Sequence, residues 1–173
     1  MEVSRPTIRE TIPGDARAIA EVHVRAWQHA YRGQMPDDFL GRLSVDEREA
    51  MWRSGLTDPR PGRGCFVAED QHGRIVGFGP TSDEGATEVT GEVHAIYLEP
   101  EAVGTGVGRE LFALASAELR ERGFRAATLW VLQTNERARR FYERAGWRLD
   151  GAVSTERVDC ANLPTVRYRA ELA

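Results

Sequence analysis

The hydrophobic and polar positions change their period several times along the chain, and each change marks an expected element. Residues 5–12 alternate apolar and polar side chains, which predicts a strand. Over residues 15–31 the apolar side chains recur every three or four positions, which predicts a helix with one buried face. A second helix is expected over residues 44–56, because Ser44 followed by Glu47 forms a capping-box pattern.

The middle of the chain contains two short apolar runs, a polar stretch and then a segment rich in glycine. Residues 65–80 form two apolar runs around a Gln-His-Gly-Arg turn, which predicts a hairpin. The polar and acidic stretch 81–92 is expected to be mostly a turn. Residues 92–100 predict a strand that is stopped by a proline, and the glycine stretch 103–108 leads into a helix that ends near residue 122.

The last third of the chain predicts a central strand, a short helix and a closing pair of strands. Residues 126–133 are apolar on both faces, as in a strand in the middle of a sheet. Residues 135–146 predict a short helix capped by Asn135, and residues 147–159 and 164–172 predict the closing strands. The fold class that follows is a mixed α/β fold with a largely antiparallel sheet. We expect a single domain over residues 1–173, because no linker or repeat interrupts the pattern.

Composition narrows the class of protein further. The chain has 173 residues, a net charge of −4 and no basic block, which disfavours binding to nucleic acid or to an anionic membrane surface. No run approaches the ~18 apolar residues of a membrane span. Cys65 and Cys160 are far apart in the sequence, which favours free thiols and a cytoplasmic location. The four histidines have no metal-type spacing, so no metal is expected.

The glycine stretch raises the first question of chemistry. Gly104, Gly106 and Gly108 precede a helix, but Arg109 follows where a phosphate-binding Walker loop needs lysine. The spacing also differs from the G-x-G-x-x-G of dinucleotide-binding folds. Two interpretations stay open. The loop can hold an anion on its N–H groups at a helix start, or it can be a close-packed turn.

Two sequence blocks favour the first interpretation, because together they resemble one family. The stretch YLEPEAVGTGVGRELF resembles the acetyl-CoA loop of the GNAT superfamily of N-acetyltransferases, and LWVLQTNERARRFYERAGWRLDG resembles the segment that follows that loop. The matching positions of the second block are Asn135, Ala138, Phe141, Tyr142, Gly146 and Trp147. One position departs from the family pattern, because Val103 stands where glutamine or arginine is usual. The resemblance implies a three-layer domain with a central sheet of six to seven strands and helices on both faces.

The resemblance also implies an activity and a set of coenzyme contacts. The implied reaction is direct transfer of an acetyl group from acetyl-CoA to the primary amine of a small molecule, with both substrates bound together. The implied coenzyme-binding residues are Tyr97, Leu98, Val103, Gly104, Thr105, Gly106, Val107, Gly108, Asn135 and Tyr142. A backbone N–H of Tyr97 or Leu98 would bind the carbonyl oxygen of the acetyl group.

The candidate catalytic residues are Tyr142 and Glu92. Tyr142 is the expected acid for the leaving thiolate, and we expect it in the cleft with Phe141 in the core, because adjacent residues cannot share a helix face. The alternative is that both form a core aromatic pair. Glu92 is the expected base that takes a proton from the amine, and an exposed strand carboxylate is the alternative. His94 lies on the same strand face, so it is the second candidate for the base.

The acceptor side is less defined by the sequence. Trp27 and Tyr31 are spaced to share one helix face and could line an acceptor cleft with Glu92 and His94, or they could be core residues. The acidic residues Asp83, Glu84 and Glu88 would attract a cationic amine, or they could lie at a solvated hairpin tip. Two other functions stay open: acetylation of a protein N-terminus or lysine, and a non-catalytic module that binds acyl-CoA. The resemblance also allows a homodimer.

Overall fold

The protein folds around one mixed sheet of eight strands. The structure, a computed structural model, describes residues 6–87 and 89–172. The strands follow the order β1-β2-β3-β4-β6-β8-β7, and β5 pairs with β3 beside this path. Their bounds are β1 Thr7–Glu10, β2 Arg63–Glu69, β3 Ile75–Thr87, β4 Thr90–Val93, β5 Tyr97–Leu98, β6 Ala126–Leu132, β7 Arg148–Val158 and β8 Ala161–Glu171. In the described chain only β4 and β6 pair in parallel, so the prediction of a mixed, largely antiparallel fold is confirmed.

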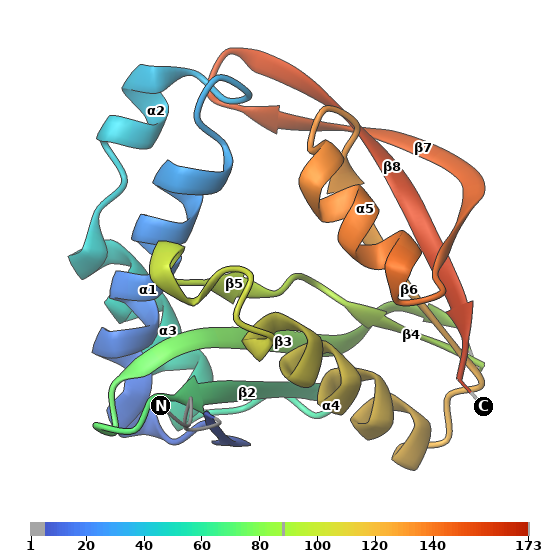
Figure 1. The fold of residues 1–173 in the computed structure, drawn as a ribbon, viewed down its shortest axis with the longest axis horizontal. Helices are drawn as coiled ribbons and strands as arrows, with labels where there is room; N and C mark the ends of the chain where they lie inside the picture. The colour runs from blue at the N-terminus through green and yellow to red at the C-terminus, as the bar shows by residue number, and fades with distance from the viewer. Residues whose placement is uncertain (1–5, 88, 173) are drawn as a thin grey trace.

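Helices cover both faces of the sheet, as Figure 1 shows. Their bounds are α1 Ala16–Ala30, α2 Asp37–Gly41, α3 Val45–Thr57, α4 Val107–Glu121 and α5 Glu136–Arg144. Alternate residues of β2 face opposite helices, as a period of two requires. Phe66 and Ala68 pack in a cluster with Leu111 of α4, whereas Val67 packs in a cluster with Ile19 of α1.

A second buried cluster joins α4 and α5 to strands β6 and β8. Phe112 of α4 and Tyr142 of α5 share a buried cluster with Leu129 of β6 and Tyr168 of β8. Strand β6 lies between β4 and β8, which confirms the prediction of a central strand. The helix signals were also reliable, because Ser44 accepts a hydrogen bond from the Glu47 N–H at 3.2 Å and caps α3.

The sheet splits where the site described below forms. Strands β4 and β6 pair only from Thr90 to Glu92, opposite Ala126 to Thr128. After Val93 the chain leaves β6, and β5 then pairs with β3 alone. Strand β6 continues to Leu132 with β8 as its partner. The two halves of the sheet therefore diverge, as seen between β5 and β6 in Figure 1.

Two expectations about element boundaries were wrong. Residues 81–92 are not mostly a turn, because β3 continues to Thr87 and β4 begins at Thr90. The predicted strand over 92–100 is interrupted at residues 94–96, where the sheet splits. The short helix α2 was not foreseen. Glu88, one of the residues expected to attract a cation, lies outside the described residues.

Candidate active site

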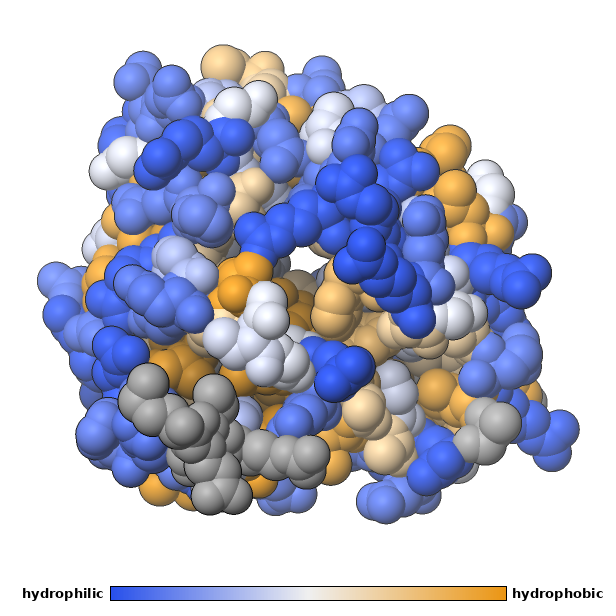
Figure 2. All heavy atoms as spheres, viewed as in Figure 1, coloured by the Kyte–Doolittle hydropathy of each residue, from blue (hydrophilic) through white to orange (hydrophobic). Residues whose placement is uncertain are grey.

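A cleft of about 1210 Å³ opens at the split in the sheet. Figure 2 shows an opening near the centre of this face, with apolar residues around it and hydrophilic residues above it. The end of α1, residues 92–98, the glycine loop, the end of β6 and α5 all contribute to its walls. The predicted site residues that line the cleft are Trp27, Tyr31, Glu92, His94, Tyr97, Leu98, Val103, Gly104, Thr105, Gly106, Gly108, Asn135 and Tyr142. Val107 differs, because its side chain is buried in the cluster beneath α4.

The three glycines serve two different structural needs. Gly104 and Gly106 have φ of 84° and 98°, a left-handed conformation that favours glycine. Gly108 instead allows close packing, because a Cβ there would lie 3.1 Å from Cδ1 of Leu98. In the described part of the chain, the N–H groups of Gly104 and Gly106 donate to no backbone carbonyl. Together with the first N–H groups of α4, they form a concentration of donors that suits an anion.

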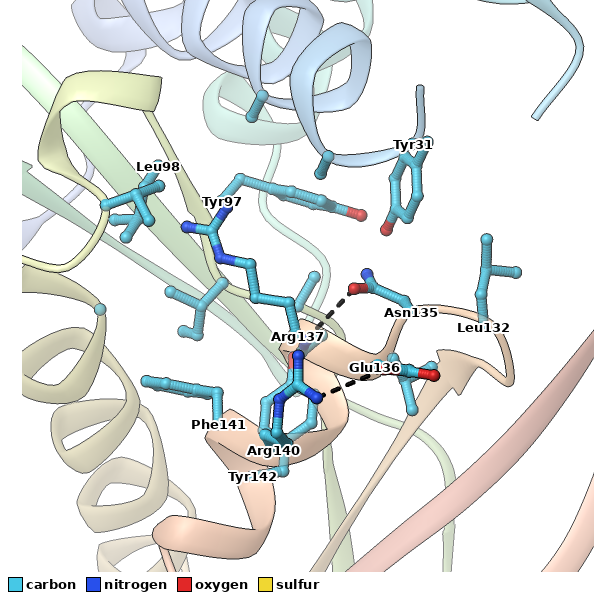
Figure 3. Close-up of a pocket in the computed structure, with 18 of the residues that line it drawn as sticks. Tyr31, Tyr97, Leu98, Leu132, Asn135, Glu136, Arg137, Arg140, Phe141 and Tyr142 are labelled. Atoms are coloured by element: carbon cyan, nitrogen blue, oxygen red, sulfur yellow. Dashed lines mark hydrogen bonds and ion pairs between the residues drawn. The ribbon is translucent and has the colours of Figure 1, made fainter. Parts of the chain in front are cut away.

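Four arginines line the same end of the cleft, and sequence reasoning did not single them out. Arg109 follows the glycine loop, and Arg137, Arg140 and Arg144 lie on α5. Figure 3 shows Arg137 extending from α5 into the cleft, while Arg140 is paired with Glu136 at 3.3 Å. We call these four residues the arginine end of the cleft.

The strand register determines which backbone N–H faces the split. The Glu99 N–H donates to the Val76 carbonyl at 2.8 Å, and Leu98 is opposite Gly77. Opposite residues in an antiparallel pair alternate between hydrogen-bonded and non-hydrogen-bonded types. Leu98 is therefore of the second type, and its N–H points away from β3. Of the two backbone donors expected from the sequence, the geometry favours Leu98.

Tyr142 both packs in the core and lines the cleft. Its ring centroid lies 5.4 Å from that of Phe112 and 6.1 Å from that of Tyr168. Burial raises the pKa of its hydroxyl above the ordinary value, and the nearby Tyr97 adds to this rise. The hydroxyl therefore stays protonated near neutral pH and can donate a hydrogen bond. Phe141 lines the cleft as well, so the two adjacent aromatic residues do not divide into one core and one cleft residue.

Glu92 and His94 are neighbours at the far wall of the cleft. Oε1 of Glu92 lies 3.4 Å from Nδ1 of His94. The Glu92 side chain is 18% exposed and that of His94 is 40% exposed, so the carboxylate is the more shielded of the two. A carboxylate beside an imidazole can accept a proton directly or through the ring. The sequence expectation that these two residues act at one place is consistent with this contact.

Aromatic side chains form the wall between these groups and α1. The rings of Trp27 and Tyr31 meet edge to face with centroids 5.2 Å apart. Figure 3 shows the hydroxyl groups of Tyr31 and Tyr97 pointing toward one another. Burial is the main cause that raises the pKa of both tyrosines, so both phenols are neutral near pH 7. This wall is therefore apolar, with two neutral hydroxyl groups.

The acidic residues near the cleft are not all those expected from the sequence. Asp83 does not line the cleft and instead lies 4.0 Å from the guanidinium of Arg122. Glu156 of β7 does line it, although no pattern in the sequence distinguished this residue from its exposed neighbours. The described residues hold no group of three or more histidines, cysteines and acids that could bind a metal. No helix within those same residues is long and apolar enough to cross a membrane.

His23 lies behind the aromatic wall and makes the stability of the fold depend on pH. Its Nδ1 accepts a hydrogen bond from Nε1 of Trp52 at 3.2 Å, and its ring stacks on Tyr97 with centroids 5.3 Å apart. Burial lowers its pKa to about 4, and the charge of Arg48 on α3 adds to this effect.

We expect the free energy of unfolding to fall as the pH drops from about 6.5 toward 4. In this range the unfolded chain binds one more proton at His23 than the folded chain, which costs about 1.4 kcal/mol per pH unit. Urea unfolding of the wild type and His23→Gln at pH 7 and pH 5 would measure the difference. The variant should lose less stability between the two pH values. Parallel losses would contradict the assignment, and the exposed His72→Gln serves as the control.

A glycine loop at a helix start whose N–H groups suit an anion, an arginine-lined mouth and a split mixed sheet are features expected of an α/β protein that binds a phosphate-bearing coenzyme. Comparison of the sequence with protein-family models identifies the family within this class. The chain belongs to the acetyltransferase (GNAT) family, whose model matches residues 18–147. It is an acetyltransferase that depends on acetyl-CoA, and the predicted family and enzyme class are confirmed.

Known proteins of similar sequence and structure agree with this family. The uncharacterized N-acetyltransferase YuaI of Bacillus subtilis is 37% identical over 132 residues, which are 75% of this chain and 73% of YuaI. A mycothiol acetyltransferase of Propionibacterium freudenreichii is 40% identical over 141 residues, and the match spans 80% of this chain but only 40% of that protein. YncA of Salmonella typhimurium, solved with acetyl-CoA, has the same fold, with a TM-score of 0.73, 22% identity and coverage of 98% of this chain and 95% of that one.

Proposed function

We propose that this protein acetylates the primary amine of a small molecule by direct attack, with acetyl-CoA and the amine bound together in the cleft. The observation that carries the proposal is the separation of charge within one cleft. Backbone N–H groups of the glycine loop and four arginines of α4 and α5 line one end, and the carboxylate of Glu92 on β4 lines the other, with Tyr142 also in the lining. A coenzyme with several phosphates fits the first end, and a cationic amine fits the second.

The coenzyme contacts that we propose follow from the geometry of the loop. The N–H groups of Gly104 and Gly106, with those that begin α4 at Val107 and Gly108, would bind the pyrophosphate. Arg137 would add a charged donor, which offsets the missing side chain at position 103. Asn135 would contact the coenzyme with its free amide group, because its Oδ1 accepts from the Ala138 N–H at 3.2 Å.

The acetyl group would then lie at the split in the sheet. The Leu98 N–H faces this space and would bind the carbonyl oxygen as negative charge develops on it. Tyr142 would donate a hydrogen bond to the sulfur as the amine displaces it. An alkyl amine with a pKa near 10.4 must lose a proton before it attacks, which costs about 4.6 kcal/mol at pH 7. We propose Glu92, directly or through a water molecule, as the group that receives this proton.

The role of Glu92 can be tested through the dependence of activity on pH. Replacing Glu92 with glutamine removes the base but keeps the size of the side chain. We expect the activity profile of Glu92→Gln to move toward alkaline pH, because solvent must then deprotonate the amine. Turnover measured from pH 6 to 10 with one amine gives the profile. A profile that superimposes on that of the wild type would exclude Glu92 and favour His94 or water.

The proposed function is tested by following the release of free thiol from acetyl-CoA with a panel of small amines. The chain has no lysine, because all 23 of its basic residues are arginines, so acetylation of lysines on the enzyme cannot contribute. We expect thiol release to depend on the amine and to match the amount of acetylated product. If peptides with a free N-terminus or lysine are the only acceptors, the function is protein acetylation. If coenzyme binds but no acceptor raises thiol release, the non-catalytic alternative holds.

A further inference from the structure

Glu156 is a carboxylate of the cleft that the proposed reaction does not use. It lies on β7, two residues before Val158, so both side chains are on the same face of the strand. Val158 packs in a buried cluster with Met35, Leu40 and Leu132. This packing fixes the end of the β7–β8 hairpin against α1 and α2. Glu156 is thereby held at the cleft, which it lines.

The charge of Glu156 has no cationic partner in the described part of the chain. No arginine or histidine among these residues lies within ion-pair distance of its carboxylate. Its charge instead acts on the neutral hydroxyl groups of Tyr31 and Tyr97 and contributes to their raised pKa values. Arg48 acts on Tyr97 with the opposite sign but, within the described chain, forms no ion pair with Glu156, so a bound cation would still find a carboxylate to pair with.

The part of the cleft wall that carries Glu156 is built by strands whose described residues contribute no arginine to the lining. The four arginines that line the cleft come from α4 and α5, whereas the lining residues from α1, β4, β6, β7 and β8 include none. Glu92 and Glu156 also lie far apart along the sheet. Glu92 is opposite Thr128 of β6. Ser154 lies at the level of Leu132, because both are paired with Thr165 of β8, and Glu156 lies two residues further along. This offset is about six residues, or roughly 20 Å of backbone at ~3.3 Å per residue.

Between the two carboxylates the wall combines apolar and aromatic side chains with the polar side chains of Gln34, Thr134 and Thr165. Tyr31, Trp130 and Leu132 all line this part of the cleft. A chain of methylene groups would bury its surface there, while aromatic faces favour a nearby ammonium group. An acceptor with a single amine, deprotonated by Glu92, would make no use of the Glu156 carboxylate at this distance.

We propose that the acceptor is an elongated alkyl diamine, with one amine acetylated near Tyr142 and a second, charged amine bound by Glu156. This inference rests on the proposed function and adds the substrate class to it. Glu156 is then a specificity residue, since it contacts the part of the acceptor that does not react. An acceptor with a carboxylate at that position is disfavoured by repulsion from Glu156.

The test compares α,ω-diaminoalkanes with alkyl monoamines of the same length. In the wild type we expect kcat/KM to be about fourfold higher for the best diamine than for its monoamine, since the second ammonium contributes about as much as an exposed ion pair. In Glu156→Gln this preference should fall to about one. The loss should appear in the KM of the diamine, while values for the monoamine stay within about twofold. Glu136→Gln, which removes a carboxylate from the arginine end, should keep the preference.

Two results would overturn the assignment. One is equal activity of the wild type toward diamines and monoamines. The other is a diamine preference that survives in Glu156→Gln, or that disappears equally in Glu136→Gln. With either result the protein still acetylates amines, so the proposed function would stand and only the assignment of Glu156 would fail. If no amine of any kind is acetylated, the proposed function itself fails and this assignment fails with it.

Discussion

Replacing Tyr142 with phenylalanine is expected to lower kcat by about 100-fold, with little change in the affinity for the coenzyme. The size follows from what a positioned donor or acid contributes to a reaction, which is at least ~10²-fold. The substitution removes only the hydroxyl group, so the packing of the ring on Phe112 and Tyr168 is preserved. Turnover with a saturating amine and the dissociation constant for coenzyme A would separate the two effects.

The raised pKa of the Tyr142 hydroxyl indicates how it acts on the leaving thiolate. Burial raises this pKa above the ordinary value, whereas a free thiol has a pKa near 8.5. Complete proton transfer from the phenol to the thiolate is therefore uphill, and stabilisation by a donated hydrogen bond is the favoured role. The matched control is Tyr168→Phe. This hydroxyl donates to Glu143 at 2.6 Å outside the cleft, so its removal should cost about 1 kcal/mol of stability but keep kcat. Unchanged turnover in Tyr142→Phe would remove Tyr142 from the mechanism.

The second large effect concerns stability, because replacing Arg25 with alanine is expected to lower the free energy of unfolding by about 3 kcal/mol. Glu99 is only 3% exposed, and Nε of Arg25 lies 2.9 Å from each of its carboxylate oxygens. Removing the arginine leaves a buried charge without its partner, which is a costly change in a folded protein. Glu99 immediately precedes Pro100 and the glycine loop, so this ion pair also connects α1 to the loop.

Chemical denaturation of three variants would measure this effect. Arg17→Ala is the matched control on the same helix, since Arg17 is half exposed and its Asp46 partner is 88% exposed, so a clearly smaller loss is expected. Combining Arg25→Ala with Glu99→Gln should recover part of the stability, because the buried charge is then gone. Equal losses for Arg17→Ala and Arg25→Ala would show that burial of Glu99 does not determine the cost.

The sequence predicted those elements whose signals are local. Asn135 and Ser44 cap their helices as expected, since each side chain accepts a hydrogen bond three residues ahead. The strand within 81–92 was missed because its polar residues are buried by tertiary partners. Thr81 is 1% exposed and donates to Glu118 of α4 at 2.5 Å, a contact that no local pattern contains.

The candidate site was predictable only where a motif marked it. The glycine loop and Tyr142 were found through the family pattern, and all but the Val107 side chain line the cleft. The arginines of α5 were not singled out, because charged residues on a helix resemble an ordinary solvated face. Glu156 lies in a strand whose residues are nearly all exposed, so its position at the cleft depends on how the hairpin packs against α1 and α2.

The central claim is that acetyl-CoA binds in this cleft with its phosphates at the arginine end and its acetyl group at the split in the sheet. A crystal structure of the protein with acetyl-CoA measures this directly. We predict the pyrophosphate on the N–H groups of Gly104, Gly106 and Gly108, the carbonyl oxygen on the Leu98 N–H and the sulfur within hydrogen-bond reach of Tyr142. A coenzyme bound outside the cleft, or with its sulfur away from Tyr142, would contradict the account.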